Sequence, residues 1–246
     1  MAETDAPRPM THGQLVAKVL NDPAIRAAVE SRPAAAEAKR RYDESAVGIL
    51  ADLTVLGFHV ESVQDLYQRR MDYRSAVPVL LDWLPRVDYM PLFESIVSAL
   101  AFVGPAKKQR QQIFLQYFRN PTWPGDPQTP PGQRTISERI RFAVAEGLHR
   151  TAGPAIADDL IDLALNRSYG ETRAAIILGL PKTRDDRVPT ILITVLNDPT
   201  VRTYAVKVLG QMRYEPARQV ITAMADLPDR NLRAHIRTAL KRIDRT

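Results

Sequence analysis

Residues 196–210 read LNDPTVRTYAVKVLG, a stretch that joins a helix start to a helical pattern of apolar side chains. Aspartate is preferred just before a helix, and proline is tolerated at the first helical position, where its missing N–H leaves no hydrogen bond unmade. Asp198 and Pro199 therefore predict that a helix begins here. Small and apolar residues follow three and seven positions after Arg202, which places them on one face of that helix.

The same pattern occurs at four places in the second half of the chain. The arginines, separated by 32, 29 and 31 residues, are Arg141, Arg173, Arg202 and Arg233. The leucines seven residues after them are Leu148, Leu180, Leu209 and Leu240. Second helices are expected between these first helices, at residues 155–165, 187–196 and 215–225. A period of about 30 residues with two helices in each period predicts an α-solenoid, in which helix pairs stack side by side.

The rest of the chain also has helical rather than strand periodicity. The apolar residues of one expected helix fall at offsets 0, 3, 4, 7 and 8, and they are Val188, Ile191, Leu192, Val195 and Leu196. No alternation of apolar and polar residues beside an Asn-Gly or Asp-Gly turn suggests a β-hairpin. Gly-Pro pairs at residues 104–105 and 153–154 are expected to end one helix and begin the next. The predicted fold class is all-α.

These residues resemble the HEAT-repeat family, a group of armadillo-like α-solenoids. The resemblance rests on Asp198-Pro199, Val201-Arg202, Ala205 and Leu209-Gly210 in the first helix of a repeat, and on Val77-Pro78 and Val188-Pro189 in the second. It implies a right-handed α-solenoid of helical hairpins, similar to bacterial HEAT-repeat proteins of unassigned role. It also implies that the recurring arginines pair with a neighbouring aspartate between repeats. The residues expected to have structural roles are Arg141, Arg173, Arg202, Arg233, Asp198 and Leu209.

The expected organisation is a single continuous solenoid with two departures from the repeat. Residues 1–41 are rich in alanine and interrupted by prolines, which predicts an N-terminal tail or loose helical cap. N-terminal HEAT-like repeats are expected at residues 42–119, and C-terminal repeats at residues 136–246. Between them, residues 120–135 contain five prolines and two glycines, a composition that predicts a loop.

Composition excludes several classes of protein. The 246 residues include no cysteine, which rules out a disulfide scaffold, a thiol nucleophile and cysteine-based metal sites. The polar start lacks a secretory signal, and no apolar run is long enough to cross a bilayer, so we expect a cytoplasmic protein without a membrane segment.

The net charge is +6, and residues 200–246, with ten basic and four acidic side chains, account for all of it.

No combination of residues suggests catalysis or a bound metal. The four histidines lack metalloprotease spacing, the glycines are too dispersed for a phosphate-binding loop, and no serine lies in a nucleophile elbow. Aspartates at positions 158, 159 and 162 are expected to complement a helix dipole rather than to bind a cation. We therefore expect a protein that is not an enzyme and that has no cofactor and no metal.

The second helices of a curved solenoid are expected to line a concave face that holds another protein. The candidate partner-binding residues on these helices are Lys108, Arg110, Asp159, Asp162, Thr190, Thr194, Arg218 and Thr222. The alternative is a nucleic-acid-binding protein related to HEAT-like alkylpurine DNA glycosylases. Those enzymes handle DNA with tryptophan, tyrosine and a catalytic aspartate, whereas this chain has only two tryptophans, Trp83 and Trp123. A HEAT-like bilin lyase has no supporting residue beyond the repeat, and the sequence leaves both a monomer and a homodimer open.

Overall fold

The computed structural model describes residues 33–124 and 133–245. Within these ranges the chain forms helices and no strands, so the predicted all-α fold class is confirmed. The chain divides into two compact units, residues 1–47 and residues 48–246. Residues 1–32 and the central part of the proline-rich segment, residues 125–132, lie outside the described ranges. None of the described helices combines the length and the apolar character that a transmembrane segment requires.

The first described helix, α3, spans Pro33–Val55. The boundary expected between residues 41 and 42 therefore falls inside a continuous helix, because Pro33 occupies the first helical position, where proline does not interrupt a helix. Residues 48–55 at the end of α3 belong to the second unit. There the carboxylate of Asp52 accepts a hydrogen bond of 2.7 Å from the indole Nε1 of Trp83.

The second unit continues with a series of mostly short helices. They are α4 (Val63–Gln68), α5 (Val77–Trp83), α6 (Met90–Phe102), α7 (Lys107–Arg119), α8 (Ile136–Thr151), α9 (Ala157–Leu165), α10 (Arg173–Gly179), α11 (Val188–Val195), α12 (Arg202–Gln211), α13 (Arg218–Ala223) and α14 (Arg230–Ile243). Single turns of 3-10 helix precede or follow several of them. The second helices expected at residues 155–165, 187–196 and 215–225 correspond to α9, α11 and α13.

Local sequence signals explain where these helices begin and end. The two Gly-Pro pairs separate α6 from α7 and α8 from α9, as predicted. After the proline-rich segment, α8 starts with a capping box. The hydroxyl of Thr135 accepts from the backbone N–H of Glu138 at 3.2 Å, and the carboxylate of Glu138 accepts from the backbone N–H of Thr135 at 2.8 Å. These reciprocal bonds satisfy two N–H groups at the helix start.

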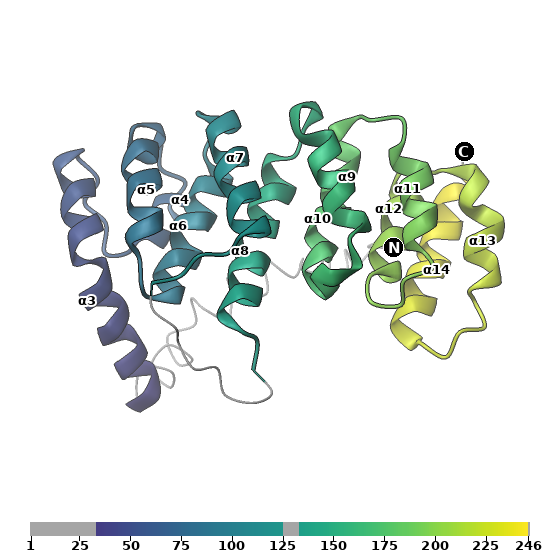
Figure 1. The fold of residues 1–246 in the computed structure, drawn as a ribbon, viewed down its shortest axis with the longest axis horizontal. Helices are drawn as coiled ribbons and strands as arrows, with labels where there is room; N and C mark the ends of the chain where they lie inside the picture. Colours follow the sequence, from purple (N-terminus) through teal and green to yellow (C-terminus); the bar gives the residue numbers. More distant parts are fainter. Residues whose placement is uncertain (1–32, 125–132, 246) are drawn as a thin grey trace, which may run out of the picture. The chain divides into compact units, whose positions relative to one another are not determined.

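The helices of the second unit pack in a regular pattern. The even-numbered helices contact one another in succession from α4 to α14, while α5, α7, α9, α11 and α13 each contact the following even-numbered helix. In Figure 1 these odd-numbered helices accordingly lie beside the row of even-numbered ones. We call the helices α4, α6, α8, α10, α12 and α14 the even row, and the helices α5, α7, α9, α11 and α13 the odd row.

The repeated positions found in the sequence lie in the core between these helices. All four residues three positions after the recurring arginines are buried, and they are Val144, Ile176, Ala205 and Ile236. Leu148, Leu180 and Leu209 are also buried. Leu240 in α14 is only partly buried. The sequence period therefore corresponds to a periodic core.

Gly210 allows α12 and α14 to approach closely. A β-carbon at this position would lie 2.5 Å from the Cα of Ala239 and 2.6 Å from its Cβ. Real β-carbons do not come so near to another backbone atom, so any larger residue would have to push the two helices apart. The close contact between α12 and α14 therefore explains why a glycine follows the leucine at the end of the first-helix motif.

We predict that Gly210→Ala destabilises the protein by at least about 1–3 kcal/mol, the usual cost of overpacking, because α14 must move away from α12. Gly104→Ala is the matched control, since a β-carbon there meets nothing within 4 Å. Urea unfolding followed by circular dichroism measures both variants. Equal stability of the two variants would contradict the close approach.

Candidate functional site

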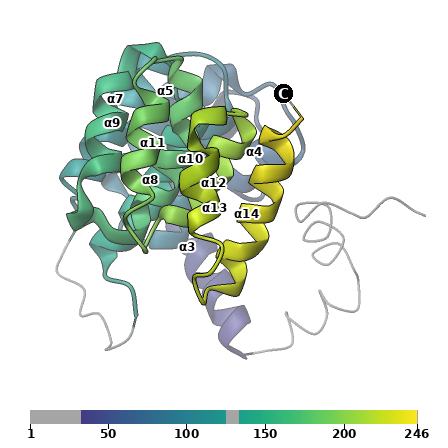
Figure 2. The same cartoon turned by 90° about the vertical axis from the view of Figure 1, so that its right-hand side faces the viewer.

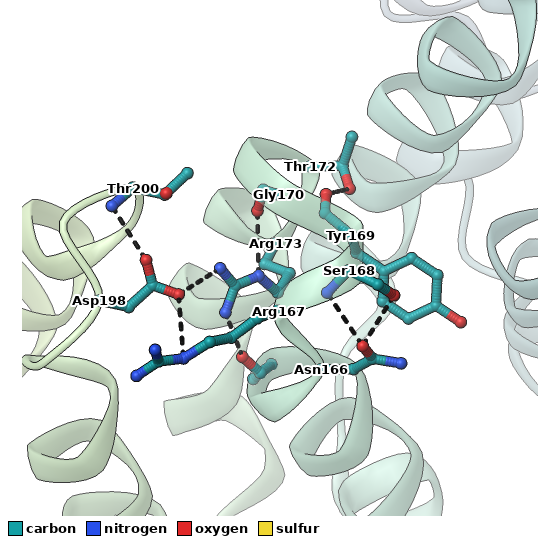
Figure 3. A network of polar contacts seen from close by, with 10 residues as sticks. Asn166, Arg167, Ser168, Tyr169, Gly170, Thr172, Arg173, Asp198 and Thr200 are labelled. Atoms are coloured by element: carbon teal, nitrogen blue, oxygen red, sulfur yellow. Dashed lines mark hydrogen bonds and ion pairs between the residues drawn. The ribbon is translucent and has the colours of Figure 1, made fainter.

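The recurring arginine of α10 makes the predicted pair with an aspartate. Arg173, which is 2% exposed, donates from Nη2 to Oδ2 of Asp198 at 2.5 Å. Its Nε donates to the carbonyl of Gly170 at 3.0 Å, and Nη1 donates to the carbonyl of Ala164, near the end of α9, at 3.1 Å (Figure 3). This one side chain therefore joins α9, α10 and the turn before α12.

Asp198 stabilises that turn by a hydrogen bond and does not cap the first turn of a helix. Its Oδ1 accepts from the backbone N–H of Thr200 at 3.0 Å, and α12 begins only at Arg202. The expected helix start at Asp198-Pro199 is therefore a separate turn. Burial raises the pKa of Asp198, but hydrogen bonds from Arg173 and Thr200 outweigh it, so the pKa lies below its ordinary value. The aspartate is consequently charged at neutral pH.

The other three recurring arginines differ from this one. Arg141 donates from Nε to the carbonyl of Phe118 near the end of α7 at 3.0 Å, and its guanidinium lies over the ring of Tyr169. The Nε of Arg202 has no hydrogen-bond partner among the described residues. Arg233 is exposed. Among the described residues these three arginines form no ion pair with an aspartate, so the predicted arginine–aspartate ladder was wrong at these positions.

The structure also corrects the role predicted for Arg110. It was expected to bind a partner, but it is 2% exposed. Its guanidinium donates to three carbonyls, those of Leu100 in the last turn of α6 and of Gly104 at 2.9 Å and Pro105 at 2.8 Å before α7. Burial lowers the pKa of Arg110. Lys108, two residues earlier, is exposed as expected.

Two of the predicted binding residues already have ion-pair partners within the protein. Asp159 of α9 lies 2.6 Å from Arg119 of α7, and Arg218 of α13 lies 2.8 Å from Asp244, just after α14. These pairs link neighbouring helices. Solvent screens ion pairs of this exposure, so they orient side chains more than they stabilise the fold.

The remaining predicted binding residues are exposed on the odd row. Asp162 lies on α9, Thr190 and Thr194 on α11, and Thr222 on α13. The hydroxyls of Thr194 and Thr222 donate to backbone carbonyls four residues earlier, at 3.2 Å and 2.8 Å. Thr222 and Arg218 line a cavity of about 580 Å³ on α13, whereas the other positions are spread over three helices.

A cavity of about 600 Å³ lies instead on the even row, between α6 and α8. The residues that line this α6–α8 groove are Glu94, Ser98, Gln133, Arg134, Arg139, Phe142, Ala143 and Glu146. Near the start of both helices, Arg139 of α8 pairs with Glu94 of α6 at 2.8 Å. At their ends, the guanidinium of Arg150 lies over the ring of Phe102 at 4.1 Å. These two contacts show that α6 and α8 run in the same direction on either side of the groove.

The acidic side chains at the groove are paired with bases. Besides the Arg139–Glu94 pair, Glu146 lies 2.9 Å from Nε of Arg150, and Glu171 lies 3.3 Å from Nη2 of Arg134. A hydrogen bond with the imidazole of His149 lowers the pKa of Glu146 despite its partial burial. The groove therefore has a charge-balanced rim and no unpaired carboxylate among its lining residues.

Sequence reasoning missed this groove because its lining comes from two helices that are far apart in the chain. One signal was present: Glu94, Ser95 and Ser98 are the three polar residues in the otherwise apolar sequence of α6, MPLFESIVSALAF. Glu94 and Ser98 are four residues apart and share one face of the helix, whereas Ser95 is buried. Two polar residues at that spacing indicate a helix face outside the core.

Across the described ranges, no cluster of three or more histidine, aspartate or glutamate side chains is arranged to hold a metal ion. No protein-family model, no curated protein and no solved structure matches this chain.

We predict that Asp198→Asn costs about 3 kcal/mol at pH 7, because it leaves the charge of Arg173 buried without its partner. The folded-state pKa of Asp198 is lowered, so its contribution is present above the unfolded pKa of about 3.9 and disappears as the pH falls through the folded value. The difference between wild type and variant should therefore shrink below pH 4 in urea unfolding. The exposed Asp162→Asn is the control and should change little at any pH.

We further predict that Arg110→Ala costs about 2–4 kcal/mol, because it leaves buried carbonyls at the end of α6 without a donor. Lys108→Ala, two residues earlier and exposed, should stay within about 0.5 kcal/mol of wild type. Thermal and chemical unfolding of the two variants distinguish the two positions. A stable Arg110→Ala protein would restore Arg110 as a binding candidate.

Proposed function

We propose that residues 48–246 form a HEAT-like, right-handed α-solenoid that serves as a non-enzymatic cytoplasmic scaffold for another protein. The main support is the α6–α8 groove on the even row, whose helices contact one another in succession. Helix pairs that bury their apolar faces only against neighbouring pairs are typical of solenoids, and such proteins use extended concave surfaces for binding. The periodic core at the repeated positions supports the same interpretation.

The proposed binding face is the even row and not the odd row that the sequence suggested. Helices on the inside of a curved stack lie closer together than those on the outside. The even-numbered helices contact one another throughout the series, whereas among the odd-numbered helices only α9 and α11 make comparable contact. Several predicted residues on the odd row are also engaged in ion pairs or bonds to their own helix. We therefore assign the concave face to the even row.

The lining of the groove suits a short protein segment with an apolar side chain. Ser98 and Ala143 are small and leave room between the helices, and Phe142 adds an aromatic surface. The guanidinium of Arg134 lies 3.8 Å from the centre of the Phe142 ring, which fixes both side chains at one end. A volume of about 600 Å³ falls within the usual range of ligand pockets. An apolar anchor with polar groups around it is a common mode of protein recognition.

The electrostatics of the groove favour binding over catalysis. A general base or nucleophile needs a carboxylate that can reach a substrate. Here Glu94, Glu146 and Glu171 each face a cation of the protein itself. Their charges are balanced locally, which also makes the groove a poor site for a polyanion.

A peptide-display experiment tests this proposal. A library of random 12-residue peptides is selected against the full chain, and the selected peptide is titrated into wild type and variants by calorimetry. We expect Ala143→Trp to weaken binding at least tenfold, because an indole fills the groove. Thr190→Trp, an equivalent change on the exposed surface of α11, is the control and should have no effect.

Circular dichroism of both tryptophan variants checks that the helices are retained. If Thr190→Trp abolished binding and Ala143→Trp did not, the partner would occupy the odd row and the groove assignment would be wrong. Failure to select any peptide that binds the full chain would count against the scaffold function itself.

A further inference from the structure

The exposed face of α14 is strongly basic. The helix and the two residues after it contain six basic side chains, Arg230, Arg233, Arg237, Lys241, Arg242 and Arg245, and all six are exposed. No acidic residue lies between positions 230 and 243. The other exposed residues of the helix are small or polar, namely Asn231, Ala234 and Thr238.

Four of these cations form a single row along the helix. Arg230, Arg233, Arg237 and Lys241 are separated by three, four and four residues, spacings that place side chains above one another on one helix face. At 1.5 Å per residue, the row is about 16 Å long. We call these four side chains the α14 ridge. Figure 2 views the unit from the end where α13 and α14 lie.

The α14 ridge lies on a helix that is capped at its start and packed on its opposite side. The carboxylate of Asp229 caps the helix and accepts hydrogen bonds from the backbone N–H groups of Asn231 at 2.8 Å and Leu232 at 3.0 Å. The opposite side of the helix is buried against the unit, with Leu232, Ile236, Ala239 and Ile243 each at most 2% exposed. The main contacts of this helix are with α12 and α13.

The ridge cations have no ion-pair partner among the described residues, in contrast to those at the α6–α8 groove. The two nearest acids in the sequence are already used: Asp229 caps the helix, and Asp244 pairs with Arg218 at 2.8 Å. Four like charges in one row create a positive potential that the protein does not neutralise. Such a surface attracts polyanions over long range.

We propose that the α14 ridge binds the phosphate backbone of duplex nucleic acid without sequence specificity. Guanidinium groups match phosphate oxygens in geometry and charge, and a row of cations can follow the phosphates of one strand. The exposed face has no aromatic or large aliphatic side chain, so it lacks the anchors of a protein interface and the stacking platforms of single-strand binding. Because the apolar side of α14 is buried in the core, the helix cannot insert that side into a lipid surface.

This inference is independent of the proposed protein binding, since the α14 ridge and the α6–α8 groove share no residue. It also requires no chemistry on the nucleic acid. A scaffold with both surfaces would hold a protein segment near a duplex.

Fluorescence anisotropy with a labelled 20-base-pair DNA duplex tests the proposal at 25–200 mM NaCl. Four phosphate contacts predict that log K falls with log salt concentration at a slope of about −3.6. Replacing two ridge cations in Arg233→Gln/Arg237→Gln should reduce this slope by about two and weaken binding at least tenfold at low salt. Arg233→Lys/Arg237→Lys keeps both charges and should retain most of the affinity.

Two controls separate the ridge from net charge and from other anionic surfaces. Arg70→Gln/Lys108→Gln removes two charges from exposed residues away from α14 and should leave the affinity within twofold. If this control weakened binding as much as the ridge variant, net charge would explain the binding and the ridge would be rejected. Binding to phosphatidylserine vesicles or polyglutamate in preference to the duplex would also overturn the proposal.

Discussion

The packing of each helix against the next depends on hydrogen bonds from buried or half-buried arginines to the carbonyls at helix ends. A short helix leaves as large a set of unpaired C-terminal carbonyls as a long one, so a fold made of short helices has many such groups to satisfy. Arg110 satisfies one carbonyl in the last turn of α6 and two before α7, Arg141 one near the end of α7, and Arg173 one near the end of α9. In each case the arginine lies on the helix that follows the one whose carbonyl it binds. Consecutive helices are therefore joined by charged hydrogen bonds in addition to apolar contacts.

Only one of these arginines also needs a counter-ion from a more distant part of the chain. Asp198 reaches Arg173 from the turn before α12, so this pair connects three helices. A buried pair is not by itself a large source of stability, because both charges lose their hydration. Its main consequence is that Asp198 cannot be removed without leaving the guanidinium of Arg173 buried and without a carboxylate partner. The pair thus specifies how α9, α10 and α12 are arranged.

The two proposed binding surfaces differ in how their charges are compensated. At the α6–α8 groove, arginines and glutamates neutralise one another, and the space between them is set by Ser98 and Ala143. A ligand there must gain its affinity from shape and apolar contact, which salt affects weakly. On α14 the cations are uncompensated, and affinity would come from charge, which salt screens strongly. The two proposals therefore predict partners whose binding responds differently to ionic strength.

Local sequence determined the helices, the breaks between them and the period of the core, because capping residues, Gly-Pro pairs and 3.6-residue spacing act over a few residues. The burial of Val144, Ile176 and Leu209 follows from that period. Tertiary structure alone decided which polar residues are available. Lys108 and Arg110 are two residues apart, yet one is exposed and the other is buried, because only Arg110 points at the end of α6. The α6–α8 groove likewise depends on contacts across 45 residues, such as Arg139 with Glu94. No local pattern specifies which carbonyl or carboxylate a long side chain will meet, since that depends on how separate helices pack.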